Sequence, residues 1–224
     1  MFMHTRVLLV RHGATVLSRE DSFSGSTDVE LSDTGRAQAE LLGQRLKDDD
    51  IAAVYCSHKK RAIDTATLIA APHKISPVQR EALCEIDHGH WEGKRRQDVE
   101  VEFAAEYAAW EADPFVFAPQ GGESGLSVLA RALPALRQIV IDNTGKTILV
   151  VSHKATIRLL ISSLLGFEMR GYRDRLDQNP ACLNILDFKD ASHARLTLFN
   201  DISHYSDYPD RPSARLSKWW DTKK

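Results

Sequence analysis

Residues 147–153 have the sequence TILVVSH, in which an aliphatic run follows a threonine and leads into a serine and a histidine. A short, uninterrupted run of this kind is typical of a strand that is buried on both faces of a sheet. Residues 7–13, VLLVRHG, repeat the pattern and end in an arginine, a histidine and a glycine. Both runs are too short for a buried helix. The sequence therefore predicts two buried strands, each of which ends at a histidine.

Strand and helix signals alternate along the rest of the chain. We expect Ser32 to cap the first helix, and Pro134 to kink or break a later one. Helices are predicted over residues 31–47, 59–71, 98–111, 126–140 and 157–164. Further strands are predicted over residues 53–56, 183–188 and 195–199, with irregular segments over 78–93 and 113–125.

This alternation predicts an α/β fold, with a mainly parallel central sheet covered by helices on both faces as a three-layer sandwich. The chain length fits a single domain. In such sheets the ligand crevice lies at the carboxyl ends of the strands. His12 follows the first strand and His153 follows the strand at 147–151. We therefore expect the two imidazoles to share one crevice.

Charge and cysteine content narrow the class of protein. The 224 residues carry 29 Lys and Arg against 31 Asp and Glu, so the near-neutral charge of −2 gives no reason to expect nucleic-acid or membrane-surface partners. Three cysteines without a C-x-x-C pair favour a reducing compartment over a disulfide framework. No apolar stretch has the length of a signal peptide core or a membrane span. We expect a cytoplasmic protein.

The residues next to the two histidines indicate a site for a phosphate ester. Arg11 precedes His12, and Arg61 opens the helix after the second strand. Guanidinium groups bind phosphate oxygens in pairs and stay charged. A neutral imidazole can attack phosphorus, while a second imidazole, if protonated, can stabilise the charge on the phosphoryl oxygens. The leaving alkoxide then needs a proton, which a carboxylic acid can donate.

Six blocks of sequence occur in order around these residues. They are LLVRHGAT at 8–15, GSTDVELSDTG at 25–35, SHKKRAIDTA at 57–66, LCEIDHGHWEG at 83–93, GGES at 121–124 and VVSH at 150–153. Together they resemble the histidine phosphatase superfamily, also called the phosphoglycerate-mutase-like family. The resemblance covers the chain from about residue 6 to 160 and favours its phosphatase branch.

The resemblance implies a role for each matched residue. His12 would be the phosphorylated nucleophile, and Arg11, Arg61 and His153 would complete the phosphate pocket. Glu85 would donate a proton to the leaving group and then activate water as a base. The family needs no metal or other cofactor. Its members carry a small cap built from insertions, which would be residues 86–124 of a domain spanning 1–208, followed by a polar tail at 209–224.

Other residues are weaker candidates for roles in the same site. Asp87 and Glu92 lie close to Glu85 in sequence and are alternative proton donors. Besides Arg11 and Arg61, the predicted substrate-binding residues are Ser18, Ser24, Gly25 and Lys154. Lys154 stands where the family often has glycine, and Ser18 stands where it commonly has asparagine. Residues 153–160 and 175–184 are similar to cyanobacterial and plant-type members that act on phosphoserine or sugar-acid phosphates.

Several alternatives stay open beside a phosphatase of a small phosphorylated metabolite. The chain could be a cofactor-dependent phosphoglycerate mutase, although the family's mutases generally carry a longer insertion before the second histidine. It could be a phospho-ligand-binding protein without turnover, or, more remotely, a serine hydrolase acting through Ser124. A metal site at His88 and His90 lacks partner ligands, and the GKT at 145–147 lacks the first glycine of a nucleotide-binding loop. The late strands could pair across a homodimer.

Overall fold

The computed structural model describes residues 4–16 and 22–206. Six strands form one sheet in the order β3-β2-β4-β1-β5-β6. The strands are β1 (Thr5–Arg11), β2 (Ile51–Cys56), β3 (Val78–Gln79), β4 (Thr147–Ser152), β5 (Leu183–Phe188) and β6 (Ala194–Asp201). The pairs β2–β3, β2–β4 and β1–β4 are parallel, whereas β1–β5 and β5–β6 are antiparallel. The predicted α/β fold with a mainly parallel sheet is confirmed.

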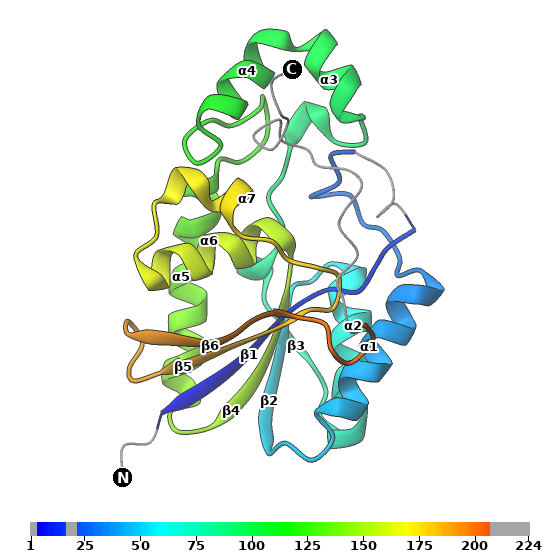
Figure 1. Ribbon diagram of the computed structural model, residues 1–224, viewed down its shortest axis with the longest axis vertical. Coiled ribbons are helices and arrows are strands. Elements are labelled where there is room, and N and C mark those ends of the chain that lie inside the picture. The colour runs from blue at the N-terminus through cyan, green and yellow to red at the C-terminus, as the bar shows by residue number, and fades with distance from the viewer. Residues whose placement is uncertain (1–3, 17–21, 207–224) are drawn as a thin grey trace.

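Helices cover both faces of this sheet (Figure 1). The larger ones are α1 (Asp33–Arg45), α2 (Lys60–Ala70), α5 (Gly125–Asp142) and α6 (Lys154–Leu165). Leu8 and Val10 of β1 pack with α1 and α2, while Val7 and Leu9 pack with α5 and α6. Successive side chains of a strand point to opposite faces, so a strand covered on both faces is apolar at every position. This is why β1 and β4 have uninterrupted aliphatic sequences.

The start of α1 fixes the loop that follows β1. Ser32 caps the helix, as expected, by accepting a hydrogen bond from the Gly35 N–H at 3.1 Å, and it donates one to the Ala14 carbonyl at 3.2 Å. The loop and the helix are in very close contact, since a Cβ on Gly35 would lie 2.0 Å from the Ala14 oxygen. A Cβ on Gly13 would lie 2.4 Å from the Gly35 oxygen. Only two glycines allow this approach, which holds His12 at the end of β1.

Two sequence-based expectations about helices were wrong in detail. The helix expected over residues 98–111 is two helices, α3 (Arg96–Glu102) and α4 (Ala104–Ala112), because Phe103 leaves the helical conformation at φ −125° and ψ 45°. Its ring instead stacks on His90, with the centroids 4.4 Å apart. Helix α5 is continuous through Pro134, so of the two expected outcomes, a kink or a break, the break does not occur, and Pro134 lies on the exposed side of the helix.

The helical spacing of Leu126, Leu129, Leu133, Leu136 and Val140 predicts an apolar stripe on this helix, and only part of that stripe is buried. Leu126, the first residue of that stripe, is 52% exposed. Leu136 and Val140 are buried as expected. The buried residues of the helix are Gly125, Val128, Ala132, Leu136, Ile139 and Val140.

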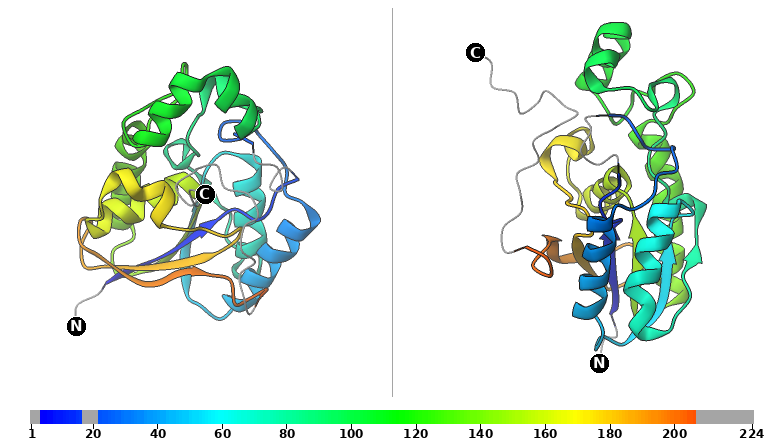
Figure 2. Two further views of the ribbon diagram at one scale, coloured as in Figure 1. Left: turned by 45° about the horizontal axis from the view of Figure 1, so that its top comes forward. Right: turned by 90° about the vertical axis from the view of Figure 1, so that its right-hand side faces the viewer.

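Helices α3 and α4 lie away from the sheet and the helices that cover it, at the top of Figure 1. They have their own apolar cluster, which contains Phe23, Trp91, Val99, Tyr107 and Trp110. The views in Figure 2 also place these helices beyond the end of the sheet. The assignment of residues 86–124 as the cap of a 1–208 domain stays a prediction.

The remaining elements are short. They are the 3-10 helices at Ala71–His73, Glu81–Leu83, Gly89–Trp91 and Met169–Gly171, and the single-turn helix α7 (Tyr172–Arg175). The predicted tail at 209–224 and the predicted substrate-binding Ser18 lie outside the described residues. Among the residues that are described, no helix is long and apolar enough to cross a membrane.

Candidate active site

His12 directly follows β1 and is held in one tautomer. Its Nδ1 lies 2.8 Å from the carbonyl oxygen of Gly13. A carbonyl only accepts hydrogen bonds, so Nδ1 carries the proton and Nε2 keeps its lone pair. The backbone N–H of His12 donates to the Ser152 carbonyl at 3.0 Å, which joins the ends of β1 and β4. The geometry therefore leaves Nε2 as a potential nucleophile.

His153 lies beside His12, as expected from the two strand ends. The ring centroids are 5.1 Å apart, and His153 is completely buried. Its Nδ1 accepts a hydrogen bond from Nε of Arg61 at 3.3 Å, so the ring proton is on Nε2. Within the described residues this buried Nε2 has no hydrogen-bond partner. A neutral His153 thus presents an N–H donor next to His12, and the ring need not be protonated to bind an oxyanion.

Electrostatics keeps both imidazoles neutral. Burial, followed by the charges of Arg11 and Arg61, lowers the pKa of His12 well below 6.5. Burial and the charge of Arg61 also lower the pKa of His153 well below 6.5. A neutral imidazole is the form that can attack phosphorus. The site therefore holds both histidines in the uncharged form at neutral pH.

Arg61 is fixed by the loop that contains residues 25–27. Its two terminal nitrogens donate to the carbonyls of Gly25 and Thr27, each at 2.7 Å, while Nε reaches His153. A guanidinium has five N–H groups, so some remain for a ligand. Arg61 thus both orients His153 and carries positive charge to the site, although burial lowers its pKa.

Arg11 supplies a second buried guanidinium. One terminal nitrogen donates to the Gln178 carbonyl at 2.7 Å, and its Nε is buried without a partner among the described residues. Burial lowers the pKa of Arg11, but an arginine remains charged in proteins. Two guanidinium groups and a free imidazole N–H make a site that suits an anion with several oxygens.

Glu92 holds the 25–27 loop and is not placed as a proton donor. Its carboxylate accepts hydrogen bonds from the N–H groups of Gly25, Ser26, Thr27 and His88 and from the Thr27 hydroxyl. Burial alone would raise the pKa of Glu92, but these hydrogen bonds lower it overall. An ionised carboxylate with so many donors stabilises the loop on which Arg61 depends.

Glu85 lies at the N-terminus of α6, the helix that follows His153. One carboxylate oxygen accepts from the N–H of Ala155 at 3.1 Å, and the other accepts from those of Ile86 and Thr156 at 3.0 and 3.2 Å. Unpaired N–H groups at a helix N-terminus favour a negative charge. Asp87, the other alternative donor, accepts instead from the Gly89 N–H at 2.7 Å.

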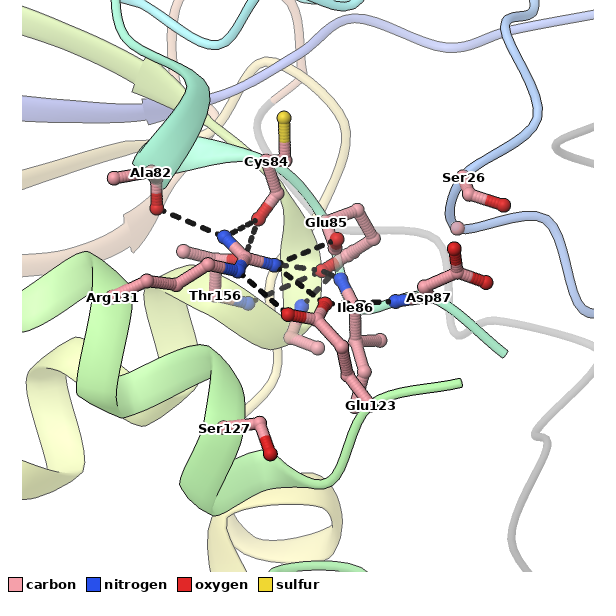
Figure 3. Close-up of polar contacts among 12 residues, drawn as sticks. Ser26, Ala82, Cys84, Glu85, Ile86, Asp87, Glu123, Ser127, Arg131 and Thr156 are labelled. Carbon is pink, nitrogen blue, oxygen red and sulfur yellow. Dashed lines mark hydrogen bonds and ion pairs between the residues drawn. The ribbon is translucent and has the colours of Figure 1, made fainter. Parts of the chain in front are cut away.

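Arg131 of α5 holds the segment that carries Glu85 (Figure 3). Its guanidinium donates to the carbonyls of Ala82, Cys84 and Glu85 and to both carboxylate oxygens of Glu123, at 2.8 to 3.0 Å. These five bonds match the number of its N–H groups. The Glu123 carboxylate also accepts from the Asp87 N–H at 3.2 Å. A single side chain therefore ties the catalytic candidate Glu85 to a rigid helix.

Sequence reasoning missed Arg131 and misjudged the role of Glu92. A lone arginine on a helix resembles a solvated surface charge, and nothing in its neighbours marks it. The GGES block did indicate a structural role for this region, because its Glu123 forms an ion pair with Arg131. Its Ser124 caps α5 by accepting from the Ser127 N–H at 3.1 Å. That hydroxyl contacts Ser127 rather than a histidine, so the structure offers no base for a serine hydrolase there.

Of the predicted substrate-binding residues outside the arginines, the structure describes Ser24, Gly25 and Lys154. Gly25 is buried, and a Cβ there would lie 1.7 Å from the Ile86 carbonyl oxygen, so only glycine fits. Ser24 is half-buried. Lys154, the first residue of α6, lies 3.7 Å from Asp177.

His88 and His90 are used in packing. His90 lies 2.9 Å from Glu106 and stacks on Phe103, and His88 is buried with its ring edge against Phe23. Across residues 4–16 and 22–206, no group of three or more His, Cys, Asp or Glu side chains could hold a metal ion.

Comparisons with known proteins identify the family of this chain. The model of the histidine phosphatase superfamily, branch 1, matches residues 7–202. Phosphoserine phosphatase 1 of Hydrogenobacter thermophilus is 31% identical over 164 residues, which are 73% of this chain and 78% of that protein. Phosphoglycerate mutase-like protein 4 of Arabidopsis thaliana is 36% identical over 160 residues, or 70% of each chain. The solved structure of Bacillus stearothermophilus YhfR superposes with a TM-score of 0.83 at 30% identity, covering 89% of this chain and 98% of that one.

The chain therefore belongs to the histidine phosphatase superfamily. Within that family it is a phosphatase, a phosphoric monoester hydrolase.

The buried histidines should make stability depend on pH. Unfolded histidine takes up a proton near pH 6.5, whereas His12 and His153 resist protonation in the fold. The unfolded state therefore binds more protons below pH 6.5, and the free energy of unfolding should fall there by up to about 1.4 kcal/mol per pH unit for each histidine. Denaturant titrations between pH 7.5 and 5 would measure this slope.

The slope should become shallower in His12→Gln and stay unchanged in a control variant of the exposed His193, His193→Gln. An equal slope in His12→Gln and the wild type would show that His12 takes up its proton as readily in the fold as in the unfolded chain.

Removing Arg131 should weaken both stability and turnover. Arg131→Met leaves the Glu123 carboxylate and three backbone carbonyls without their donor, so we expect a loss of about 2–3 kcal/mol in the free energy of unfolding. Since Glu85 is then less firmly placed, kcat should fall more than KM rises. Arg137→Met on the same helix removes an arginine that makes none of these contacts, and is the control. Unchanged kcat in a folded Arg131→Met protein would contradict a positioning role.

Proposed function

We propose that this chain hydrolyses a phosphomonoester of a small anionic metabolite, such as phosphoserine or a phosphorylated sugar acid, through a phosphohistidine on His12. The observation that carries the proposal is that two buried, neutral imidazoles lie side by side, one with a free lone pair and the other with an N–H group available to a ligand. Nε2 of His12 has a lone pair, and Nε2 of His153 has an unpartnered proton. A nucleophile and an oxyanion donor side by side are what phosphoryl transfer needs.

In the first step Nε2 of His12 forms a bond to phosphorus, and the ester P–O bond breaks. Arg11, Arg61 and the His153 N–H stabilise the charge on the phosphoryl oxygens. The leaving alkoxide takes a proton from Glu85.

In the second step a water molecule attacks the phosphohistidine. Glu85, now a carboxylate, accepts the proton of that water, the N–P bond breaks, and inorganic phosphate leaves. The helix N–H groups of Ala155 and Thr156 favour the carboxylate at this stage. His12 returns to its starting tautomer with the Gly13 carbonyl as partner, and the cycle uses no other reagent.

The phosphoglycerate mutase alternative requires the phosphoryl group to return to a sugar acid instead of water. The short stretch between Glu85 and His153 favours a phosphatase, because the family's mutases generally have a longer insertion there. Release of inorganic phosphate, measured beside isomerisation of phosphoglycerate, separates the two activities. A phospho-ligand-binding protein without turnover would bind inorganic phosphate but hydrolyse no member of a phosphomonoester panel.

The predicted location in the cytoplasm and the predicted homodimer are retained as proposals. Strand β6 lies at the edge of the sheet, and an edge strand can pair with a second copy.

Substitution of His12 and substitution of Glu85 should reduce phosphatase activity to different extents. His12→Ala removes the nucleophile, so phosphatase activity should nearly disappear. Glu85→Gln keeps the shape but cannot donate or accept the proton, so kcat should fall about 10²- to 10⁴-fold while inorganic phosphate still binds. The assay is phosphate release with isothermal titration of inorganic phosphate alongside. Equal activity in Glu85→Gln and the wild type would remove Glu85 from the mechanism.

The covalent intermediate should be detectable. Rapid quenching during turnover of a ³²P-labelled substrate should recover an acid-labile, base-stable phosphoryl group on His12. Peptide mapping locates it, and His12→Ala, in which the label cannot form, is the control. Turnover with no such adduct at any quench time would refute a phosphohistidine mechanism.

A further inference from the structure

A cluster of charged side chains borders the phosphate site on α6. Lys154 and Arg158, one helical turn apart, both contact the carboxylate of Asp177, at 3.7 and 3.2 Å. Side chains four residues apart on a helix lie on one face. Two cations therefore share one anion, and the cluster carries a net positive charge.

This cluster is continuous with the phosphate site through Arg11. The Gln178 carbonyl accepts from Arg11 at 2.7 Å, and the Gln178 N–H donates to Asp177 at 2.8 Å. Arg11 also interacts electrostatically with Lys154 and Arg158. The arginine that faces the phosphate thus stands between the phosphate site and the cluster.

The cluster lies on the side from which the leaving group must depart. Glu85, the proposed donor to the leaving oxygen, is bound to the N–H groups of Ala155 and Thr156. Lys154 precedes these two residues on the same first turn of α6. An alcohol whose oxygen receives the proton of Glu85 therefore extends near Lys154.

The charges in this cluster are incompletely balanced. The Arg158 side chain is 11% exposed, and its buried Nε has no partner among the described residues. The charge of Arg158, followed by burial, lowers the pKa of Lys154 to about 7, and burial lowers that of Arg158 to about 10. Their partner Asp177 is 44% exposed. A second anion would stabilise both cations, and the exposed carboxylate can move aside for it.

We propose that Lys154 and Arg158, with Asp177 as an exchangeable counter-ion, form a subsite that binds a carboxylate on the leaving group of the substrate. The proposal rests on the proposed function and narrows it to phosphomonoesters of hydroxy acids. Arg173, which also lies near this region in sequence, is not part of the subsite. The Arg173 guanidinium donates a hydrogen bond to the Asp174 carboxylate and lies over the ring face of Trp110.

Matched substrates test the subsite. 3-Phosphoglycerate and glycerol 3-phosphate differ in one carboxylate, as do O-phosphoserine and O-phosphoethanolamine. The wild type should prefer the carboxylate-bearing member of each pair in kcat/KM. Lys154→Met should reduce that preference about ten- to hundredfold, the value of one hydrogen bond between charged groups. Lys154→Arg should retain most of it, and Lys47→Met, on an exposed lysine of the segment after α1, should leave it unchanged.

Asp177→Asn gives a second test, in which the preference for the carboxylate-bearing substrate should increase instead of decrease. Removal of the competing carboxylate should lower KM for 3-phosphoglycerate relative to glycerol 3-phosphate. If the preference survives in Lys154→Met and KM is unaffected in Asp177→Asn, the cluster is a structural ion pair and the subsite proposal is wrong.

An assay with an aryl phosphate that has no carboxylate distinguishes failure of the subsite proposal from failure of the proposed phosphatase function. If the wild type hydrolyses the aryl phosphate but shows no carboxylate preference within either pair, only the subsite is refuted. If it releases phosphate from no substrate, the proposed function itself is refuted.

Discussion

The hydrogen bonds of the Arg61 guanidinium are the constraint on which the site depends. Glu92 collects the N–H groups of the 25–27 loop, the carbonyls of that loop fix Arg61, and Arg61 fixes the tautomer of His153. Each contact orients the next, so a carboxylate that acts through the 25–27 loop and Arg61 determines which nitrogen of His153 carries a proton. Charged donors and acceptors are effective here because the surroundings are dry and the geometry is prepared before a ligand arrives.

The fold brings these groups together at one edge of the sheet. Parallel β1 and β4 end side by side, and their last residues deliver His12 and His153 to the same edge of the sheet. Close glycine contacts hold the loop after β1 against α1, while α6 begins immediately after β4 and offers its N–H groups to Glu85. Arg131 then connects the Glu85 segment to α5. The reacting residues thus lie directly after strands or are hydrogen-bonded to helices, and such support favours precise placement.

The sequence was sufficient to predict the strands and the two histidines because their signals are local. An apolar run that ends at a histidine can be recognised from a few residues, and the Ser32 cap follows the same logic. The roles of Glu92 and Arg131 depend mostly on partners tens of residues away, such as Gly25 and Ala82, so a local pattern marks them only weakly. The break at Phe103 was missed for a related reason: its conformation serves packing on His90, and tertiary packing overrides helix propensity there.

The excess of partly buried positive charge around Arg11, Lys154 and Arg158 affects the binding of any oxyanion. Cations that repel one another store electrostatic energy, which any bound oxyanion releases. Inorganic phosphate, the end product, meets the same donors as the reacting group. The enzyme is therefore expected to be slowed by its own product, and its thermal midpoint should rise with phosphate concentration in the manner of a linked binding equilibrium.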